Sequence, residues 1–278
     1  MRKKFLIIFI IMLIAAAVWV IWANTALTTT YIEYQSSTIP SEFDGFTIVQ
    51  ISDTHDAEIG PDNSDLVAAI SAAAPDIIVI TGDMIDSNRT DIPRALSIAA
   101  RAAEIAPTYY VNGNHEALIG SEYEKLAEGL KNAGVTVLED TSVTLFQGES
   151  SIRLTGLTDI GFISGTVAEK ISAMEDTLSS LTGDGLDIVL SHRPELIDSY
   201  VAAGAELVFS GHAHGGQFRL PFIGGLIAPG QGLFPEYDAG LYETGSTSMI
   251  VSRGIGNSVF PIRLNNRPEL VVTELICK

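Results

Sequence analysis

The chain has 278 residues, 46% of them hydrophobic, which is enough for one sizeable globular domain and an accessory segment. Its 34 acidic residues outnumber its 16 basic ones, and the net charge of −18 excludes a broad basic surface, so we expect no nucleic-acid partner. Cys277 is the single cysteine, which excludes a disulfide within the chain.

The accessory segment is an uninterrupted apolar run at residues 5–23. As a helix it would be about 28 Å long, enough to cross a bilayer. Three basic residues precede it and the next one is Arg89. The positive-inside rule then predicts a single-pass anchor in the cell membrane, with residues 1–4 cytoplasmic and everything after residue 23 outside.

A cleaved signal peptide is the competing interpretation of the same run. The apolar region of a signal peptide is normally shorter, about 7–15 residues, and a small-x-small cleavage site follows it. Residues 23–26, "ANTA", match such a site poorly. We therefore favour a retained anchor.

The charge outside the membrane is even more negative than that of the whole chain. All 34 acidic residues follow the apolar run, together with 13 of the 16 basic ones, so this portion carries −21. An anionic substrate must then be attracted by a local positive charge.

Beyond the anchor, residues 24–44 are predicted to be a juxtamembrane segment with a first strand, and residues 45–278 to be the main domain. Short β-rich runs first alternate with helical segments: strands at 46–52, 76–82 and 108–113, and helices at 64–74, 91–106 and 121–134. A capping box of Ser121 and Glu124 is expected to open the last of these helices, and Gly134 to close it.

The second half of the chain contains more strands and fewer helices. Strands are predicted at "VTVLED", "SVTLFQ", "SIRLTGL", "LDIVLSH" and "AELVFSG", with helices at about 165–182 and 194–204, and strands again at "SMIVSRG", "IRLNN" and "ELVVTEL". This order predicts an α/β fold with a core of two mixed sheets flanked by helices.

Polar residues gather where five of the predicted strands end. All five histidines of the chain lie at these ends, in the company of acids and an amide: Asp53, His55, Asp83, Asp86, Asn114, His115, Glu116, His192, His212 and His214. Because ligands in open α/β architectures bind beyond the carboxyl ends of strands, these side chains are candidates for one site.

The residue types indicate a metal site. In an extended chain residues i and i+2 point the same way, so Asp53 and His55 can reach one cation, as can His212 and His214. Asp83, behind Gly82, is suited to bridge two cations with its carboxylate. Neutral imidazoles with carboxylate and amide oxygens favour Mn, Fe or Zn over Ca.

The order D-x-H, G-D-x-x-D, G-N-H-E, a lone His and G-H-x-H resembles the calcineurin-like metallophosphoesterase superfamily over residues 45–216. The tail after residue 216 resembles its bacterial membrane-anchored phosphodiesterase branch. Ala213 stands where that branch usually carries Thr, a small change that leaves the metal assignment intact. The fold that the resemblance implies is a β-sandwich of two mixed sheets flanked by helices, here preceded by one N-terminal transmembrane helix.

The resemblance also implies the roles of the site residues. The site would hold two divalent metal ions, for which Mn is the first choice and Fe and Zn are the alternatives. The ligands of the first ion would be Asp53, His55, Asp83 and His214. The ligands of the second ion would be Asp83, Asn114, His192 and His212. His115 would act near the phosphate and the leaving group, oriented by Asp86. Arg193 and Arg253 are candidates for contact with the substrate.

The expected activity is that of a dinuclear metal-dependent phosphohydrolase acting on a phosphodiester, pyrophosphate or phosphomonoester through a metal-bridging hydroxide. Two cations with two carboxylates and that hydroxide leave a net charge of about +1, which draws phosphate into an acidic domain. We expect the substrate to be a phosphorylated small molecule or a lipid-linked or cell-envelope compound. The alternatives are a dinuclear metal amidohydrolase or peptidase, and a catalytically inert metal-binding ectodomain.

Overall fold

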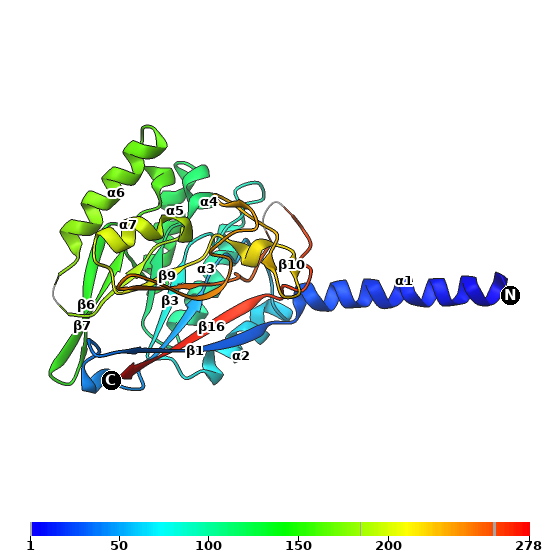
Figure 1. Cartoon of the computed structure of the whole chain (residues 1–278), viewed down its shortest axis with the longest axis horizontal. Coiled ribbons are helices and arrows are strands. Elements are labelled where there is room, and N and C mark those ends of the chain that lie inside the picture. The colour runs from blue at the N-terminus through cyan, green and yellow to red at the C-terminus, as the bar shows by residue number, and fades with distance from the viewer. Residues whose placement is uncertain (1, 184, 258–259) are drawn as a thin grey trace.

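The computed structural model describes residues 2–183, 185–257 and 260–278, which form two six-stranded sheets with helices outside and one long helix projecting from the domain (Figure 1). The first sheet has the strand order β1, β16, β2, β3, β4, β5, which are Thr28–Ser36, Glu269–Cys277, Thr47–Ile51, Ile77–Thr81, Thr108–Val111 and Thr136–Val137. The second has the order β14, β15, β9, β8, β7, β6, which are Gly240–Thr244, Thr247–Val251, Leu207–Ser210, Asp187–Leu190, Ser150–Gly156 and Thr141–Gln147.

Both sheets are mixed. In the first sheet β16 pairs antiparallel with β2, and the other pairs are parallel. In the second sheet the antiparallel pairs are the outer ones, β14 with β15 and β6 with β7. Two small hairpins lie between β9 and β14 in the chain: β10 with β11, and β12 with β13, at Arg219–Leu220, Gly224–Gly225, Ile227–Ala228 and Gly232–Leu233.

Helices cover the outer face of each sheet. On the first sheet they are α2, α3 and α5, at Ser64–Ala72, Ile92–Ala103 and Glu122–Asn132. On the second they are α6 and α7, at Val167–Leu181 and Ile197–Ala202. The short helix α4, Asn114–Leu118, follows β4, and single 3-10 turns occur at Ser41–Phe43, Pro61–Asn63, Ile160–Phe162, Pro194–Leu196 and His214–Gly216.

The core has three apolar layers because the central strands are buried on both faces. In β2, Ile48 packs between the sheets with residues of the second sheet such as Leu190 and Phe209, whereas Val49 and Ile51 pack under the helices of the first sheet. Each such side chain contributes about 1.5–3 kcal/mol when fully buried. The predicted α/β class with two mixed sheets and flanking helices is confirmed.

Helix α1, Arg2–Thr25, projects from the domain (Figure 1). It is long and apolar enough to cross a membrane, and of its residues only Ala23 is buried. After two linking residues the chain enters β1, which pairs along its length with the C-terminal strand β16.

Two local predictions are wrong. Ser121 makes no capping hydrogen bond, because its backbone is already helical (φ −66°, ψ −15°) after the tight turn at Gly120. The strand expected at "IRLNN" is absent from the described residues there, which make only an isolated bridge between Leu264 and Phe218. The backbone groups of this segment instead bind side chains, such as that of Asn24.

Candidate metal centre

The structure brings together the seven residues expected to hold metal ions. They follow β2, β3 and β4 of the first sheet and β8 and β9 of the second, whose carboxyl ends meet at one edge of the domain. Three overlapping groups of ligand atoms lie within 4.8 Å of one another: Asp53, His55 and His214; His55, Asp83 and His115; and Asp83, His192 and His212.

The first candidate site contains two imidazoles and two carboxylates, all buried. Nε2 of His55 lies 3.1 Å from Nε2 of His214 and 3.6 Å from Oδ2 of Asp83. Oδ1 of Asp53 lies 3.5 Å from the same His214 nitrogen and 3.9 Å from that of His55.

The second candidate site surrounds Nε2 of His192. This atom lies 3.2 Å from each of three possible ligand atoms: Oδ2 of Asp83, Oδ1 of Asn114 and Nδ1 of His212. Oδ2 of Asp83 therefore faces both groups. Its other oxygen, Oδ1, accepts a hydrogen bond of 2.8 Å from the backbone N–H of His115.

These donor sets fit divalent cations. Ligands at right angles on metal–nitrogen bonds of about 2.0–2.1 Å are about 3 Å apart, close to the spacings in both groups. The Nδ1 atom of His192 lies 2.7 Å from the carbonyl oxygen of Thr81, which fixes a proton there and leaves the Nε2 lone pair for a ligand bond. Two buried imidazole nitrogens that face each other with their lone pairs repel each other, and a cation that both of them bind removes this repulsion.

The pKa values in the cluster also indicate that it requires a positive charge. Burial lowers the pKa of His55 to about 4, so this ring is neutral at physiological pH. Burial alone would also lower the pKa of His192, but the carboxylates of Asp83 and Asp53 raise it to about 10. Although burial opposes it, His192 in turn holds the pKa of Asp83 well below its usual range. Without a metal, a charged His192 supplies the positive charge that these carboxylates require.

The loops reach this arrangement through strained backbone. Five of the expected ligands have left-handed φ angles between 42° and 63°: Asp53, His55, Asp83, His212 and His214. Such a conformation costs about 1–3 kcal/mol for a residue with a side chain and clusters at functional sites. The reason given above for Asp53 and His55 reaching one cation, an extended chain, is therefore wrong, although the two side chains do meet.

Glycines and a buried glutamate place the shared carboxylate. A Cβ atom at Gly113 would overlap the Asp83 carboxylate, and one at Gly82, where φ is +86°, would lie 2.8 Å from the Gly113 backbone. The Glu116 carboxylate accepts hydrogen bonds from the N–H groups of Asp83, Met84 and Gly113 at 2.7–2.9 Å. Glu116 thereby ties the loops after β3 and β4 together.

His115 lies beside the first group, with its ring centroid 4.5 Å from that of His55. Its Nδ1 accepts a hydrogen bond of 3.0 Å from the backbone N–H of Ser87. An imidazole that accepts at Nδ1 carries its proton on Nε2. The Asp86 carboxylate accepts hydrogen bonds from the Asn88 N–H at 2.8 Å and from Arg89 at 3.3 Å.

The two arginines expected to contact substrate both lie close to buried carboxylates. Nε and Nη2 of Arg193 donate to the two oxygens of Asp159 at 2.7 and 3.1 Å. Nη2 of Arg253 donates to Oε1 of Glu269 at 2.7 Å. A phosphate group would have to compete with these carboxylates for the guanidinium groups.

Three residues near the centre received no role from the sequence, although Glu116 was among the candidates at the strand ends. Glu116 follows His115 in "GNHE", so its position in the motif was a usable signal. Glu195 lies 3.6 Å from Nε2 of His212, and burial raises the pKa of its carboxyl group. Arg263 is fully buried, with Nη2 at 3.4 Å from Nδ1 of His214, and nothing local in the sequence marks it.

A cavity of about 390 Å³ opens beside the cluster. It is lined by His55, Asp56, Ala57, Asp86, Arg89, Asp91, Arg94, Asn257 and Pro261. A second cavity of about 530 Å³ is lined in part by Arg193, Glu195 and Lys170.

The chain resembles known proteins along most of its length. It is 33% identical over 258 residues to the uncharacterized metallophosphoesterase YkuE of Bacillus subtilis (strain 168), covering 90% of this chain and 85% of that protein. It is 32% identical over 235 residues to the phosphodiesterase YaeI of Escherichia coli (strain K12), covering 83% and 82%. The fold is similar to the crystal structure of phosphopantetheinyl hydrolase (PptH) from Mycobacterium tuberculosis, with a TM-score of 0.50 at 12% identity, covering 77% of this chain and 91% of that one.

The model of one protein family, calcineurin-like phosphoesterase, matches residues 46–216, the part of the chain that holds all the residues of both candidate sites. This match and the two bacterial relatives support metal binding and hydrolysis of phosphoester bonds. The chain belongs to the calcineurin-like phosphoesterase family.

Proposed function

We propose that the protein is a dinuclear metal-dependent phosphohydrolase that cleaves a phosphodiester, pyrophosphate or phosphomonoester. The observation that supports this best is the position of Asp83, whose Oδ2 faces the imidazoles of both candidate sites, at 3.6 Å from His55 and 3.2 Å from His192. One ion would be held by Asp53, His55, Asp83 and His214, and the other by Asp83, Asn114, His192 and His212. Mn suits this mixture of imidazole, carboxylate and amide ligands, with Fe or Zn as the other candidates.

Two bound divalent cations would supply positive charge for the phosphate oxygens and would make water a nucleophile at neutral pH. The chain's own contribution is to orient the groups around the substrate. Glu116 fixes the loop of Asp83 through three backbone hydrogen bonds, and the left-handed backbone of the loops after β2 and β9 sets the direction of the side chains proposed as ligands. Such preorganisation is a large part of electrostatic catalysis.

His115 is proposed as the group that acts on the leaving oxygen. The Ser87 N–H donates to Nδ1 and so places the ring proton on Nε2, the atom that would donate to a phosphoryl or leaving-group oxygen. Asp86 is proposed to assist by holding the 86–90 turn, where its carboxylate and carbonyl oxygens accept hydrogen bonds from residues 88–90. Its orienting effect on His115 would thus be exerted through the Ser87 backbone.

Arg193 and Arg253 remain candidates for substrate contact, and Arg193 is the better placed. It lines the 530 Å³ cavity, in which Lys170 offers a second positive charge. Binding of a phosphate there would exchange part of the Arg193–Asp159 pair for a substrate contact.

Helix α1 is proposed to be a retained single-pass anchor, with the N-terminus cytoplasmic and the domain of residues 45–278 outside the cell. Its last turn contacts the domain: the Asn24 side chain accepts a hydrogen bond of 2.7 Å from the Arg263 N–H and donates one of 3.1 Å to the Arg263 carbonyl oxygen. A segment that is removed after export would have no need of such contacts. Anchoring keeps the site near the bilayer, which favours a lipid-linked or cell-envelope substrate.

The test uses the full chain in detergent, stripped of metal with a chelator and assayed with bis(p-nitrophenyl) phosphate. We expect activity to appear when Mn is added and to fall more than about 100-fold in Asp83→Asn, which removes a ligand shared by both ions. His115→Ala should lose activity while it still binds Mn. Asp62→Asn, at an exposed turn, is the matched control and should keep full activity.

Two outcomes would contradict the proposal. If the protein takes up two equivalents of metal but hydrolyses no phosphate ester, the inert ectodomain is the better description. If the metal-loaded protein cleaves peptides or amides and no phosphate ester, the amidohydrolase alternative holds.

A further inference from the structure

We propose that the domain has a second contact with the lipid bilayer besides α1, formed by five exposed apolar side chains beside the end of that helix. This interfacial patch consists of Leu220, Phe222, Ile223, Phe260 and Ile262. The inference rests on the proposed anchoring by α1 and is independent of the proposed chemistry.

The end of α1 is fastened to Asn257 and to residues 260–267. The Asn24 side chain donates to the carbonyl oxygen of Arg263 and accepts from its N–H. Its Oδ1 also accepts a hydrogen bond of 3.3 Å from Nδ2 of Asn257. Arg267 donates to the carbonyl oxygens of Ala26 and Leu27 at 2.9 and 2.6 Å. This segment is therefore held where the chain leaves the membrane.

Arg267 also marks the depth of this segment. Its guanidinium carbon lies 4.7 Å from the centre of the Trp22 ring, a cation–π contact. Tryptophan side chains near the end of a membrane helix prefer the headgroup region. The stacked arginine then lies at the level of the lipid headgroups.

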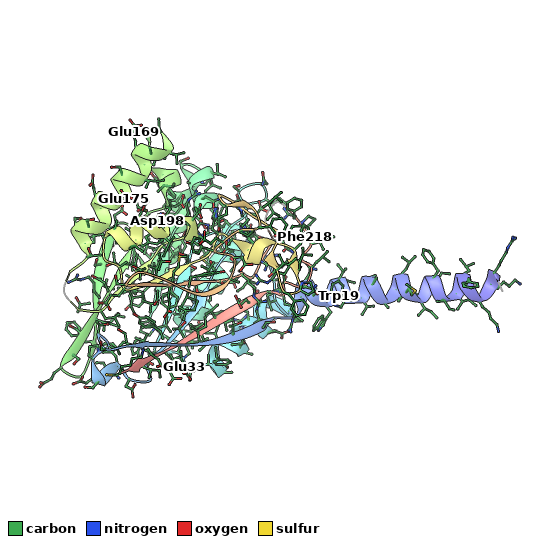
Figure 2. The ribbon with its side chains drawn as sticks, in the orientation of Figure 1. Trp19, Glu33, Glu169, Glu175, Asp198 and Phe218 are labelled. Atoms are coloured by element: carbon green, nitrogen blue, oxygen red, sulfur yellow. The ribbon has the colours of Figure 1, made fainter. Side chains whose placement is uncertain are left out.

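Residues 260–264 are in turn fastened to the β10–β11 hairpin and to Gln217 just before it. Nε2 of Gln217 donates to the carbonyl oxygens of Phe260 and Ile262 at 3.0 and 2.9 Å. The N–H of Arg219 donates to the carbonyl oxygen of Leu264 at 2.9 Å. Figure 2 shows Phe218 at the end of the domain from which α1 extends, near the label of Trp19.

The tip of this hairpin combines exposed apolar side chains with a strained backbone, and both are unfavourable for a surface in water. Phe222 is fully exposed and has a φ of 68°, a left-handed conformation that glycine or asparagine would adopt at less cost. Ile223 beside it is 65% exposed. Strain at a bulky apolar residue at a loop tip is accounted for if the side chain is inserted into an apolar phase.

The charges around the patch fit a membrane surface. In a chain with 34 acidic residues, the segments 214–235 and 253–268 contain no Asp or Glu. Of their four arginines, Arg219 pairs with Asp238, Arg253 pairs with Glu269, and Arg263 is buried. Acidic side chains such as Glu169, Glu175 and Asp198 lie at the other end of the domain, on α6 and α7 (Figure 2). The two segments that carry the patch thus have no acidic side chain of their own that would repel anionic phospholipid headgroups.

Docking of this patch would bring the candidate metal centre close to the membrane. The 390 Å³ cavity beside His55 is bounded on one side by Asn257 and Pro261, which belong to the segment that α1 holds. The cavity would then open at headgroup level. A phosphoester carried by a lipid could enter it without leaving the bilayer.

The experiment measures membrane depth and requires no turnover. The full chain, with Cys277→Ser to remove the native thiol, receives one cysteine at a time: Leu13→Cys in α1, Ile223→Cys in the patch, or Phe146→Cys. Phe146 is the matched control, because it is 73% exposed on the β6–β7 hairpin, at the end of the domain away from α1 (Figure 1). Each cysteine carries a polarity-sensitive fluorophore, and the protein is reconstituted into phosphatidylcholine vesicles with or without nitroxide-labelled lipid.

We expect the labels at positions 13 and 223 to lose most of their emission to the nitroxide lipid and the label at 146 to keep it. If position 13 is quenched and position 223 behaves like 146, the anchor stands and the second contact is wrong. If neither is quenched, α1 does not insert and both ideas fail. A blue shift at 223 that depends on protein density and not on nitroxide lipid would show that a second copy covers the patch, which overturns the proposal.

Discussion

Nε2 of His55 and Nε2 of His214 lie 3.1 Å apart inside the protein, on loops that follow strands of different sheets. Two nitrogen lone pairs at this distance repel each other unless a proton or a cation lies between them. A divalent cation held between them, as proposed, would therefore stabilise this edge of the domain.

Metal should accordingly stabilise the folded chain. Mn at 100 times its dissociation constant adds about 2.7 kcal/mol, or roughly 5–10 °C in the melting temperature of a domain of this size. Thermal unfolding of the chelator-treated full chain with and without Mn measures this. His214→Gln should lose most of the shift, and an equal shift in that variant would contradict the site.

Metal affinity should rise with pH. His192 must give up its Nε2 proton to ligate a metal, and beside Asp83 and Asp53 its pKa is raised to about 10. A raised pKa means that the proton is present throughout the physiological range and competes with the ion. Between pH 6 and 8 the affinity for Mn should therefore increase, by up to about tenfold per pH unit, with release of a proton.

Titration calorimetry in two buffers of different ionisation enthalpy measures that proton. An affinity that is independent of pH over this range would show that His192 is already neutral in the metal-free protein.

Glu116→Gln should weaken the site without removing a ligand. The carboxylate accepts three backbone N–H groups, from Asp83, Met84 and Gly113, whereas an amide has one acceptor oxygen and brings its own donors. We expect a loss of about 1–3 kcal/mol in the free energy of unfolding and a fall in metal affinity. Denaturant unfolding checks the first, and Glu124→Gln, an exposed acid on α5, should change neither.

Arg263→Lys should lower metal affinity by about 10–100-fold, because the guanidinium positions His214 by packing against it and by holding the carbonyl groups of the neighbouring Arg253 and Gly256. Arg263 lies against His214, and its guanidinium also binds Asn257 and the carbonyl oxygens of Arg253 and Gly256. A lysine has one charged nitrogen and cannot make these contacts together.

Metal titration of Arg263→Lys should be compared with that of Arg89→Lys, whose side chain is exposed. If the Arg263 variant folds and binds Mn as tightly as the Arg89 variant, the guanidinium does not position His214.

The site shows how far local sequence reasoning reaches. The spacing of D-x-H and of G-H-x-H, and the position of each motif after a β-rich run, were sufficient to predict that Asp53 and His214 share one edge of the domain. The extended backbone that was expected to bring them there is not observed. Both residues reach that edge through left-handed backbone, which no periodicity in the sequence indicates.

Contacts between distant segments were out of reach for the same reasoning. Arg193 was a candidate for binding phosphate, but its pairing with Asp159 depends on loops that come together only when the second sheet forms. Arg263 was placed in a strand that does not exist, and its burial against His214 bridges 49 positions of the chain.

The amino-acid sequence alone determined the α/β class, the apolar N-terminal helix and the identity of the residues at the strand ends, because periodicity and residue chemistry are local properties. Tertiary structure decided which nitrogen faces which, that the Ser87 N–H binds His115, and that an apolar hairpin lies beside the end of α1. These depend on how loops far apart in the chain pack against one another, and that packing is a property of the whole fold.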